Sequence, residues 1–105
     1  MLIHPLVTDT DTLTTLCERL AQADFVTVDT EFMRESTYYP DLCLVQVASP
    51  NEAAAIDPKA PGIDLAPLLK LLTEADVLKV FHAGGQDLEI IYNLTGKTPA
   101  PLFDT

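Results

Sequence analysis

The chain has 105 residues, 48% of them hydrophobic, which is enough for one small domain with a buried core. Its formal net charge of −10, with only 6 Lys and Arg residues, excludes a basic nucleic-acid-binding surface of the ordinary kind. An acidic protein can nevertheless act on a phosphodiester when its carboxylates hold divalent cations, which reverse the local electrostatic field.

The N-terminus and the apolar runs predict neither a signal peptide nor a membrane-spanning helix. The first residues, "MLIHPLVTDTD", lack a basic start followed by a long apolar stretch. No apolar run reaches the roughly 18 residues that a membrane span requires. Cys17 and Cys43 have neither metal-ligand nor disulfide-rich spacing, so they predict two buried free thiols in a reducing cytoplasm. We therefore expect a cytoplasmic protein with no membrane partner.

Taken in chain order, the first half of the sequence predicts a helix and then three strands. Apolar residues at helical spacing indicate an amphipathic helix over 10–23, with Asp9 or Thr10 as its N-cap. Strands rich in apolar and β-branched residues follow at 25–30, 42–49 and 53–57. Their short connections predict antiparallel pairing.

The second half predicts helices alternating with strands. Asp64 is expected to cap a helix over 65–75, and strand 77–83 leads into a helix over 84–96 that ends at a glycine. A last strand begins at 101–105. The whole order predicts a mixed α/β sheet covered by helices. A parallel strand is normally followed by another crossover helix, so the sequence reads as a domain cut short at its C-terminus.

Two carboxylates lie at the end of the first predicted strand, in the run "FVTVDTEF". Alternate side chains of a strand share a face, so Asp29 and Glu31 are expected to project together while Thr30 points away. Carboxylates this close repel each other unless a cation lies between them. Exposed acids at the end of a strand are common, and the run "DTE" alone favours that plain interpretation.

A third acid changes the balance between these interpretations. Asp87 follows the strand and loop "VFHAGG" and falls in the first turn of a helix, where the helix dipole favours a carboxylate. If the two strands are neighbours, their carboxyl ends place Asp29, Glu31 and Asp87 around one crevice. Clustered carboxylates suit Mg²⁺ or Mn²⁺, and a site with two such ions can cleave a phosphodiester.

The motifs "VDTEF" and "FHAGGQDLEI" resemble the first two motifs of the DEDD-type 3′-5′ exonucleases. The connecting "RESTYYPDLCLVQVAS" and the closing "PLFDT" are similar to the ribonuclease D branch, so the resemblance covers nearly the whole chain from about Phe25 onward. It implies a ribonuclease H-like fold, with three antiparallel strands followed by two parallel strands. It also implies a metal-dependent exoribonuclease that hydrolyses RNA 3′ ends by a two-metal mechanism, with tRNA precursors as substrates.

Position by position, the resemblance implies a role for each residue of the two motifs. Asp29 would bridge two ions of Mg²⁺ or Mn²⁺, and Glu31 would bind the hydrolytic ion near the terminal 3′-hydroxyl. Asp87 would bind the second ion, directly or through water. Phe32 and Met33 would pack against the terminal base or ribose, and core packing is an equal alternative for Phe32.

The third motif of the family, a tyrosine followed four residues later by a fourth acid, is not found. Tyr38, Tyr39 and Tyr92 have no acid at that spacing. The sequence therefore predicts a partial exonuclease domain over 1–105, without the third motif or C-terminal RNA-binding domains. We expect it to be poorly active alone, because it lacks one metal ligand and the residue that orients the attacking water.

Three further residues lie near these motifs in the sequence. His82, at a strand end, is expected to hydrogen-bond around the acids rather than to act as a general base. Gln46 either hydrogen-bonds within the site or satisfies backbone groups. Asp104, at the start of the last strand, is not expected to hold metal.

Two other functions stay open at this point. A phosphatase with Asp29 as its nucleophile needs a second acid and a Thr or Ser in the same loop, which Glu31 and the aromatic loop fit poorly. A non-catalytic nucleic-acid-binding module on an exonuclease-like scaffold is the other alternative, and the intact acids argue against it. The predicted truncation has a further consequence, whatever the function. A sheet without its last helices exposes apolar surface and a strand edge, which predicts self-association.

Overall fold

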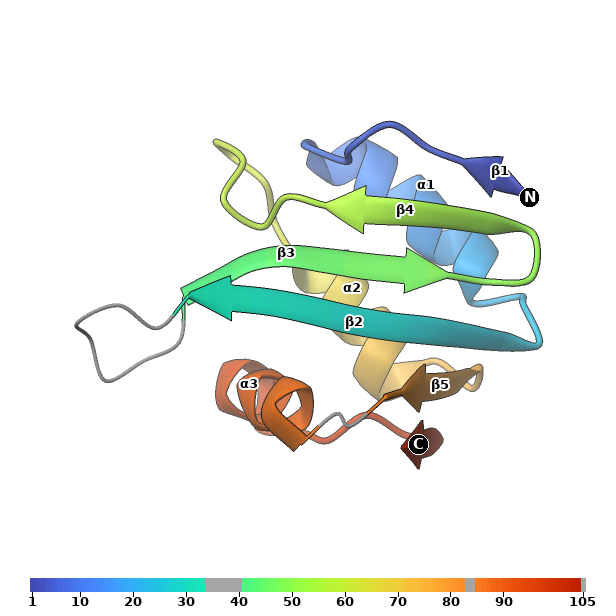
Figure 1. Cartoon of the computed structure of the whole chain (residues 1–105), viewed down its shortest axis with the longest axis vertical. Coiled ribbons are helices and arrows are strands. Elements are labelled where there is room, and N and C mark those ends of the chain that lie inside the picture. Colours follow the sequence, from blue (N-terminus) through green and yellow to red (C-terminus); the bar gives the residue numbers. More distant parts are fainter. Residues whose placement is uncertain (34–40, 83–84, 105) are drawn as a thin grey trace.

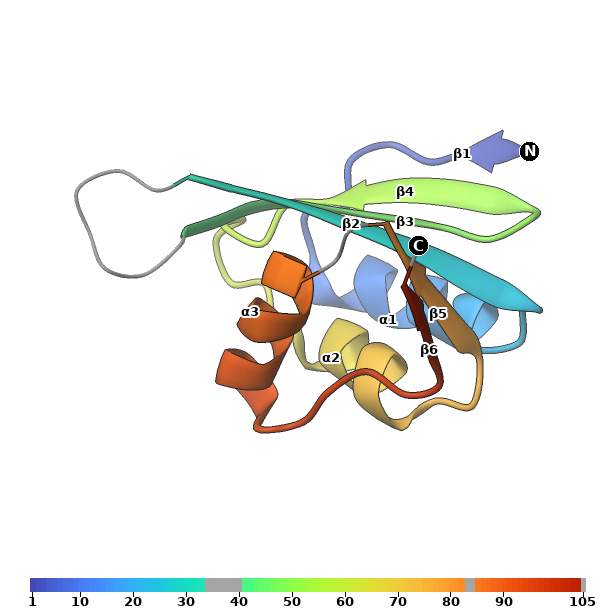
Figure 2. The same ribbon diagram turned by 60° about the horizontal axis from the view of Figure 1, so that its bottom comes forward.

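A computed structural model describes residues 1–33, 41–82 and 85–104 of the chain. Within these residues, six strands form one sheet, and the helices cover one of its faces (Figures 1 and 2). None of the helices in these ranges is long and apolar enough to cross a membrane. The elements are β1 (Leu2–Ile3), α1 (Thr10–Leu20), β2 (Phe25–Met33), β3 (Asp41–Ala48), β4 (Glu52–Ile56), α2 (Ala66–Glu74), β5 (Leu78–Phe81), α3 (Gly85–Thr95) and β6 (Leu102–Asp104).

The sheet is mixed, as the sequence predicts, in the order β1-β4-β3-β2-β5-β6. Strands β2, β3 and β4 form an antiparallel meander, and β5 and β6 run parallel to β2. The predicted arrangement of three antiparallel strands and two parallel strands is therefore confirmed. Strand β1, which pairs parallel to β4, was not predicted, because two residues are too short to show an alternating pattern.

The core lies between the sheet and the helices, and the sequence of β2 shows why. The side chains of Val26 and Val28 are buried on the helix-covered face of the sheet. The alternating residues Thr27 and Asp29 are exposed on its open face. A shift of one residue in strand register would bury the Asp29 carboxylate and expose both valines, so this alternation fixes the register. Each buried valine or leucine contributes about 1.5–3 kcal/mol of hydrophobic free energy.

The helix ends follow the predicted capping chemistry, with one correction. Asp9 caps α1, and its Oδ2 accepts a hydrogen bond of 2.9 Å from the backbone N–H of Thr12. The N-cap of α2 is Leu65 and not Asp64, although Asp64 Oδ1 accepts from the N–H of Ala66 at 2.9 Å. Gly96 ends α3 with a φ of 74°, a conformation that glycine adopts at little cost.

The cysteines are free thiols, as predicted, but they differ in burial. Cys17 lies in the core on α1, and burial raises the pKa of its thiol to about 12. Cys43, on β3, is only half-buried, so the prediction of two buried thiols was wrong for this residue. The reason is an irregularity in the pairing of β2 with β3, where the register shifts between Glu31 and Phe32 opposite Cys43. This shift interrupts the alternation that buries Val45 and Val47.

Strand β5 is shorter than β2, and this difference creates the space for the functional residues. The predicted neighbours are confirmed, because β5 pairs parallel with β2 from Phe25 to Val28. Strand β5 then ends at Phe81, while β2 continues to Met33. Helix α3 follows β5, begins beside this extension of β2 and extends toward the helix-covered side of the sheet (Figures 1 and 2). The first turn of α3 therefore meets β2 just beyond the end of β5.

Candidate metal and active site

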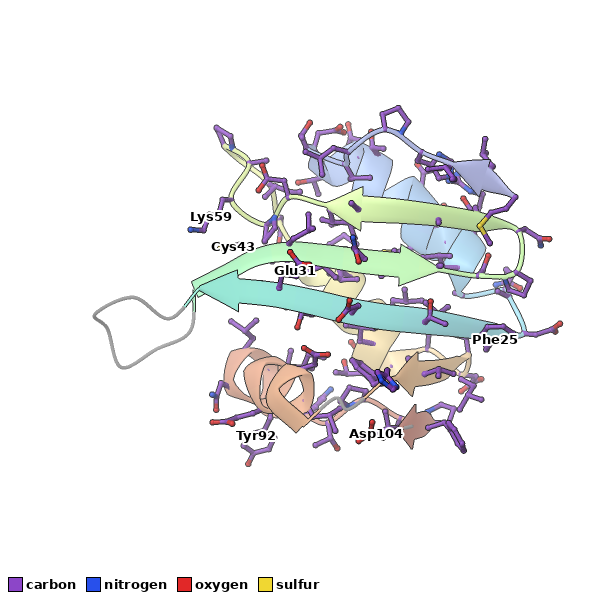
Figure 3. All side chains as sticks on the ribbon, in the orientation of Figure 1. Phe25, Glu31, Cys43, Lys59, Tyr92 and Asp104 are labelled. Carbon is purple, nitrogen blue, oxygen red and sulfur yellow. The ribbon has the colours of Figure 1, made fainter. Side chains whose placement is uncertain are left out.

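Asp29 and Glu31 lie on the open face of the sheet, as the alternation in β2 predicts. Both side chains are exposed, and the half-buried Thr30 lies between them on the helix-covered face. Gln46 of β3 is the register partner of Asp29 and is also exposed, so it shares this face with the two acids. Glu31 is labelled on β2 in Figure 3, at the end of the strand away from Phe25. The two acids of the first motif are thus adjacent and accessible to solvent.

Asp87 approaches β2 from the other side. It lies in the first turn of α3 and is 7% exposed. The hydroxyl of Thr30 donates a hydrogen bond to its Oδ1. Since Thr30 faces the helices, Asp87 meets β2 on the helix-covered side, whereas Asp29 and Glu31 project from the open side. The structure thus brings Asp29 and Glu31 together on one face of β2 and places Asp87 against the other face of the same strand.

The electrostatics at Asp87 connect it with two other acids. Burial is the main reason why the pKa of Asp87 is raised, and the negative charges of Asp29 and Asp104 raise it further. The hydrogen bond from Thr30 acts in the opposite direction, because it stabilises the ionised carboxylate. The charge of Asp29 on β2 therefore acts on the carboxyl group of Asp87 on α3.

Asp104 and Thr30 are the two residues of this region that the sequence prediction did not include. Asp104 is the register partner of Phe81, which in turn pairs with Val28, so β5 and β6 both end beside the middle of β2, next to Asp29. Figure 3 labels Asp104 on the C-terminal strand. The register of a three-residue edge strand cannot be read from sequence. The contact of Thr30 could not be predicted either, because it depends on β5 ending at Phe81, whereas the sequence pattern extends this strand over 77–83.

The carboxylates of this region fit a divalent cation by their chemistry. Within the described residues, no group of three or more His, Cys, Asp or Glu side chains is arranged to hold a metal ion. Magnesium is usually bound by one or two carboxylates together with water and substrate phosphates, and it does not require a complete protein cage. Asp29 and Glu31 supply such oxygen ligands, and a cation would relieve the repulsion that Asp29 and Asp104 exert on Asp87.

A concavity on the open face of the sheet reaches Asp29 but not Glu31 or Asp87. Its volume is about 540 Å³, and Asp29, Gln46 and His82 are among the residues that line it. The two candidates for supporting roles therefore lie near Asp29, with His82 exposed just after the end of β5. Phe32 and Met33 belong to the end of β2, but their side chains fall outside the described part of the structure. Contact of these two side chains with a nucleotide stays a prediction.

Comparison with known proteins supports the exonuclease-like architecture. A sequence model of a family described as 3′-5′ exonuclease matches residues 5–105. The ribonuclease D of Sphingobium indicum is 72% identical over 106 residues, which cover 100% of this chain and 27% of that protein. The crystal structure of Escherichia coli RNase D, described as an exoribonuclease involved in structured RNA processing, superposes with a TM-score of 0.86 at 39% identity, over 96% of this chain and 27% of that one.

A third match concerns metal. The structure of Brucella melitensis NrnC with bound Mg²⁺ superposes with a TM-score of 0.73 at 30% identity and covers 99% of this chain and 50% of that one. These likenesses confirm the predicted ribonuclease H-like exonuclease fold. The chain spans about a quarter of the length of the ribonuclease D relatives that it matches (27% for the Sphingobium protein).

Proposed function

We propose that this chain, which belongs to the 3′-5′ exonuclease family, forms the part of a metal-dependent exoribonuclease domain that carries the first two metal-binding motifs. The observation that supports this most is the hydrogen bond from Thr30, which lies between Asp29 and Glu31 in β2, to Asp87 in the first turn of α3. Acids gathered at the carboxyl ends of neighbouring strands are a common setting for ligand binding in α/β proteins.

Each acid has a different role in the proposed site. Two divalent ions, Mg²⁺ or Mn²⁺, would activate water and stabilise the leaving oxygen of the phosphodiester when bound. Asp29 and Glu31 would hold ions at the open face, where both carboxylates are exposed to solvent and substrate. Asp87 would act from the first turn of α3, directly or through water. Its burial keeps the carboxylate in one place and limits its hydration.

Other residues would position the RNA around the acids. Gln46 and His82 line the concavity beside Asp29, where they can hydrogen-bond to ligands or to the substrate. Phe32 and Met33 follow the first motif directly and would contact the terminal base or ribose. These roles are supported by position in the sequence and in the sheet.

The proposed substrates are RNA 3′ ends, with tRNA precursors as the specific class. The structured-RNA processing described for the Escherichia coli enzyme supports an RNA substrate, at 39% identity with this chain. The net charge of −10 gives this chain no basic surface of its own for phosphate binding, so bound cations are the expected source of local attraction. We also propose a cytoplasmic location, which the free thiols of Cys17 and Cys43 support.

We further propose that the 105-residue chain self-associates through β6. This strand lies at the edge of the sheet, and its residues are exposed, including Phe103 at 55%. An exposed edge strand offers backbone hydrogen-bonding groups to a second copy, and an exposed aromatic side chain adds apolar area to the contact. A second copy of the same chain is therefore the expected partner at this edge.

A labelled-RNA assay tests the proposed activity. RNA that carries a label at its 3′ end or at its 5′ end is incubated with the chain, with and without Mn²⁺. The same assay is run on a chimera in which the Sphingobium indicum sequence beyond the matched region follows Thr105. We expect early release of the 3′ label, dependence on Mn²⁺, much faster reaction by the chimera and loss of reaction in Asp29→Asn. Early release of the 5′ label, or cleavage by the Asp29→Asn chimera at the same rate, would contradict the proposal.

A further inference from the structure

Thr30 joins the first motif to the second through one hydrogen bond. Its side chain lies between Asp29 and Glu31 in sequence, and its hydroxyl donates to Oδ1 of Asp87. The donor belongs to β2 and the acceptor to α3, so the bond links the strand to the first turn of the helix. Asp87 is only 7% exposed and Thr30 is half-buried, so water competes weakly for this bond.

The contact is selective for one oxygen of the carboxylate. A hydroxyl has a single hydrogen to donate, and in this structure it is given to Oδ1. Fixing one oxygen limits rotation of the carboxylate about its side-chain bonds and thus fixes the direction of Oδ2.

Thr30 is therefore more than a neutral spacer between two acids. We propose that Thr30 is a positioning residue, which holds Oδ1 of Asp87 so that Oδ2 is directed to a divalent cation or to its bound water. This inference rests on the proposed function, because it takes Asp87 as one of the metal-binding residues. Hydrogen-bond partners of metal-binding side chains typically contribute 10–100-fold in metal affinity, so an effect of about tenfold or more is expected here.

The test measures binding of Mn²⁺ alone to the 105-residue chain by isothermal titration calorimetry. Thr30→Val keeps the shape of the side chain and removes the donor, while Thr30→Ser keeps the donor. We expect the Mn²⁺ dissociation constant to rise about tenfold or more in Thr30→Val and to stay within about threefold of wild type in Thr30→Ser. Thr73→Val is a matched control, because its hydroxyl donates to the Leu69 carbonyl within α2 at 2.7 Å, away from the acids.

The variants also separate positioning from folding. Melting temperatures measured without metal report on the stability of each variant. If Thr30→Val and Thr30→Ser are equally stable without metal and only Thr30→Ser binds Mn²⁺ like wild type, a purely structural effect does not explain the difference. If Thr30→Val does not fold, Thr30→Ala serves as the variant without a donor. Wild-type or tighter Mn²⁺ affinity in the folded variant without the donor would overturn the inference, and so would a serine variant as weak as that variant.

A different result would identify failure of the proposed metal site itself. If wild type does not bind Mn²⁺, or if Asp29→Asn binds it as tightly as wild type, the site at these acids is wrong and the role of Thr30 falls with it. If Asp29→Asn loses binding while Thr30→Val keeps it, the site stands and only the inference about Thr30 is overturned.

Discussion

The guanidinium of Arg19 on α1 donates two hydrogen bonds to the carboxylate of Glu52 on β4, one from Nη2 to Oε1 at 3.0 Å and one from Nε to Oε2 at 3.2 Å. The Nε2 of His4 lies 2.6 Å from the same Oε1. Glu52 thereby connects the first helix and the residue after β1 to the sheet. His4 also lines the concavity beside Asp29, whereas Arg19 and Glu52 are not among its lining residues. The contribution of the Arg19–Glu52 pair to stability can therefore be measured separately from metal binding.

Glu52→Gln is expected to make the stability of the chain less dependent on acid pH. The hydrogen bonds from Arg19 are the main reason why the pKa of Glu52 is lowered from its ordinary value of 4.5, and the contact with His4 adds to them. The stabilisation is fully present above about pH 4.5 and is lost as the pH falls through the lowered pKa, because protonation removes the charge. Melting followed by circular dichroism between about pH 6 and pH 3 should show a steeper fall for wild type. Parallel curves for wild type and Glu52→Gln would contradict this assignment.

Lys79→Met is expected to remove a pH dependence of stability in the alkaline range. The ammonium of Lys79 is buried and donates to the carbonyls of Ala75 and Ala100, the latter at 2.8 Å. Burial lowers the pKa of Lys79 from 10.5, and Asp76 partly opposes this. Between the lowered pKa and 10.5 the unfolded chain binds more protons, so the stability of wild type rises with pH over that range.

Lys79→Met lacks this titration, so the melting temperature of wild type relative to the variant should rise as the pH approaches about 10.5. Lys70→Met, a change at an exposed lysine of α2, provides the control. A constant difference in melting temperature between wild type and Lys79→Met over the alkaline range would show that the pKa of Lys79 is the same in the folded and unfolded states.

Asp29→Asn is expected to change stability with opposite signs in the absence and presence of metal. Without metal, removing the charge relieves repulsion of Asp87, so the melting temperature should stay the same or rise slightly. With Mn²⁺ at about 100 times its dissociation constant, wild type should gain about 2.7 kcal/mol and melt several degrees higher. The variant should lose most of this gain. An equal metal-dependent rise in both proteins would place the cation elsewhere.

Phe103→Lys is expected to reduce self-association through β6. The side chain of Phe103 is 55% exposed on the edge strand, and a lysine there adds charge to the contact between two copies. Light scattering coupled to size-exclusion chromatography, over a concentration series, should give a lower average mass for the variant. Tyr92→Lys, at a 55% exposed aromatic residue of α3, is the matched control. A monomeric wild type at the highest concentration would contradict the proposal.

Much of the fold could be predicted from the sequence, because local patterns specify it. The alternation around Val26 and Val28 gives the faces of β2, and Asp9 and Gly96 mark helix ends through side-chain capping and backbone conformation. Strand β1 could not be predicted, because it consists of two exposed residues whose pairing with β4 depends on tertiary contacts.

The candidate site was predictable in its acids and not in their contacts. The sequence places Asp29 and Glu31 on one face by strand alternation, and that arrangement is observed. The side of β2 on which Asp87 lies depends on where β5 ends and where α3 begins, and no local sequence pattern specifies either position. The hydrogen bond from Thr30 and the charge of Asp104 follow from that tertiary arrangement.

The central claim is that Asp29, Glu31 and Asp87 share bound cations, and paramagnetic broadening by Mn²⁺ tests it most directly. In nuclear magnetic resonance spectra of the ¹⁵N-labelled chain, trace Mn²⁺ should first remove the amide signals of these three residues. The amide signals of Arg19 in α1 and Glu52 in β4, which form an ion pair with each other, should persist. Early loss of the Asp29 and Glu31 signals with an unaffected Asp87 signal, or uniform broadening over the whole chain, would contradict the account.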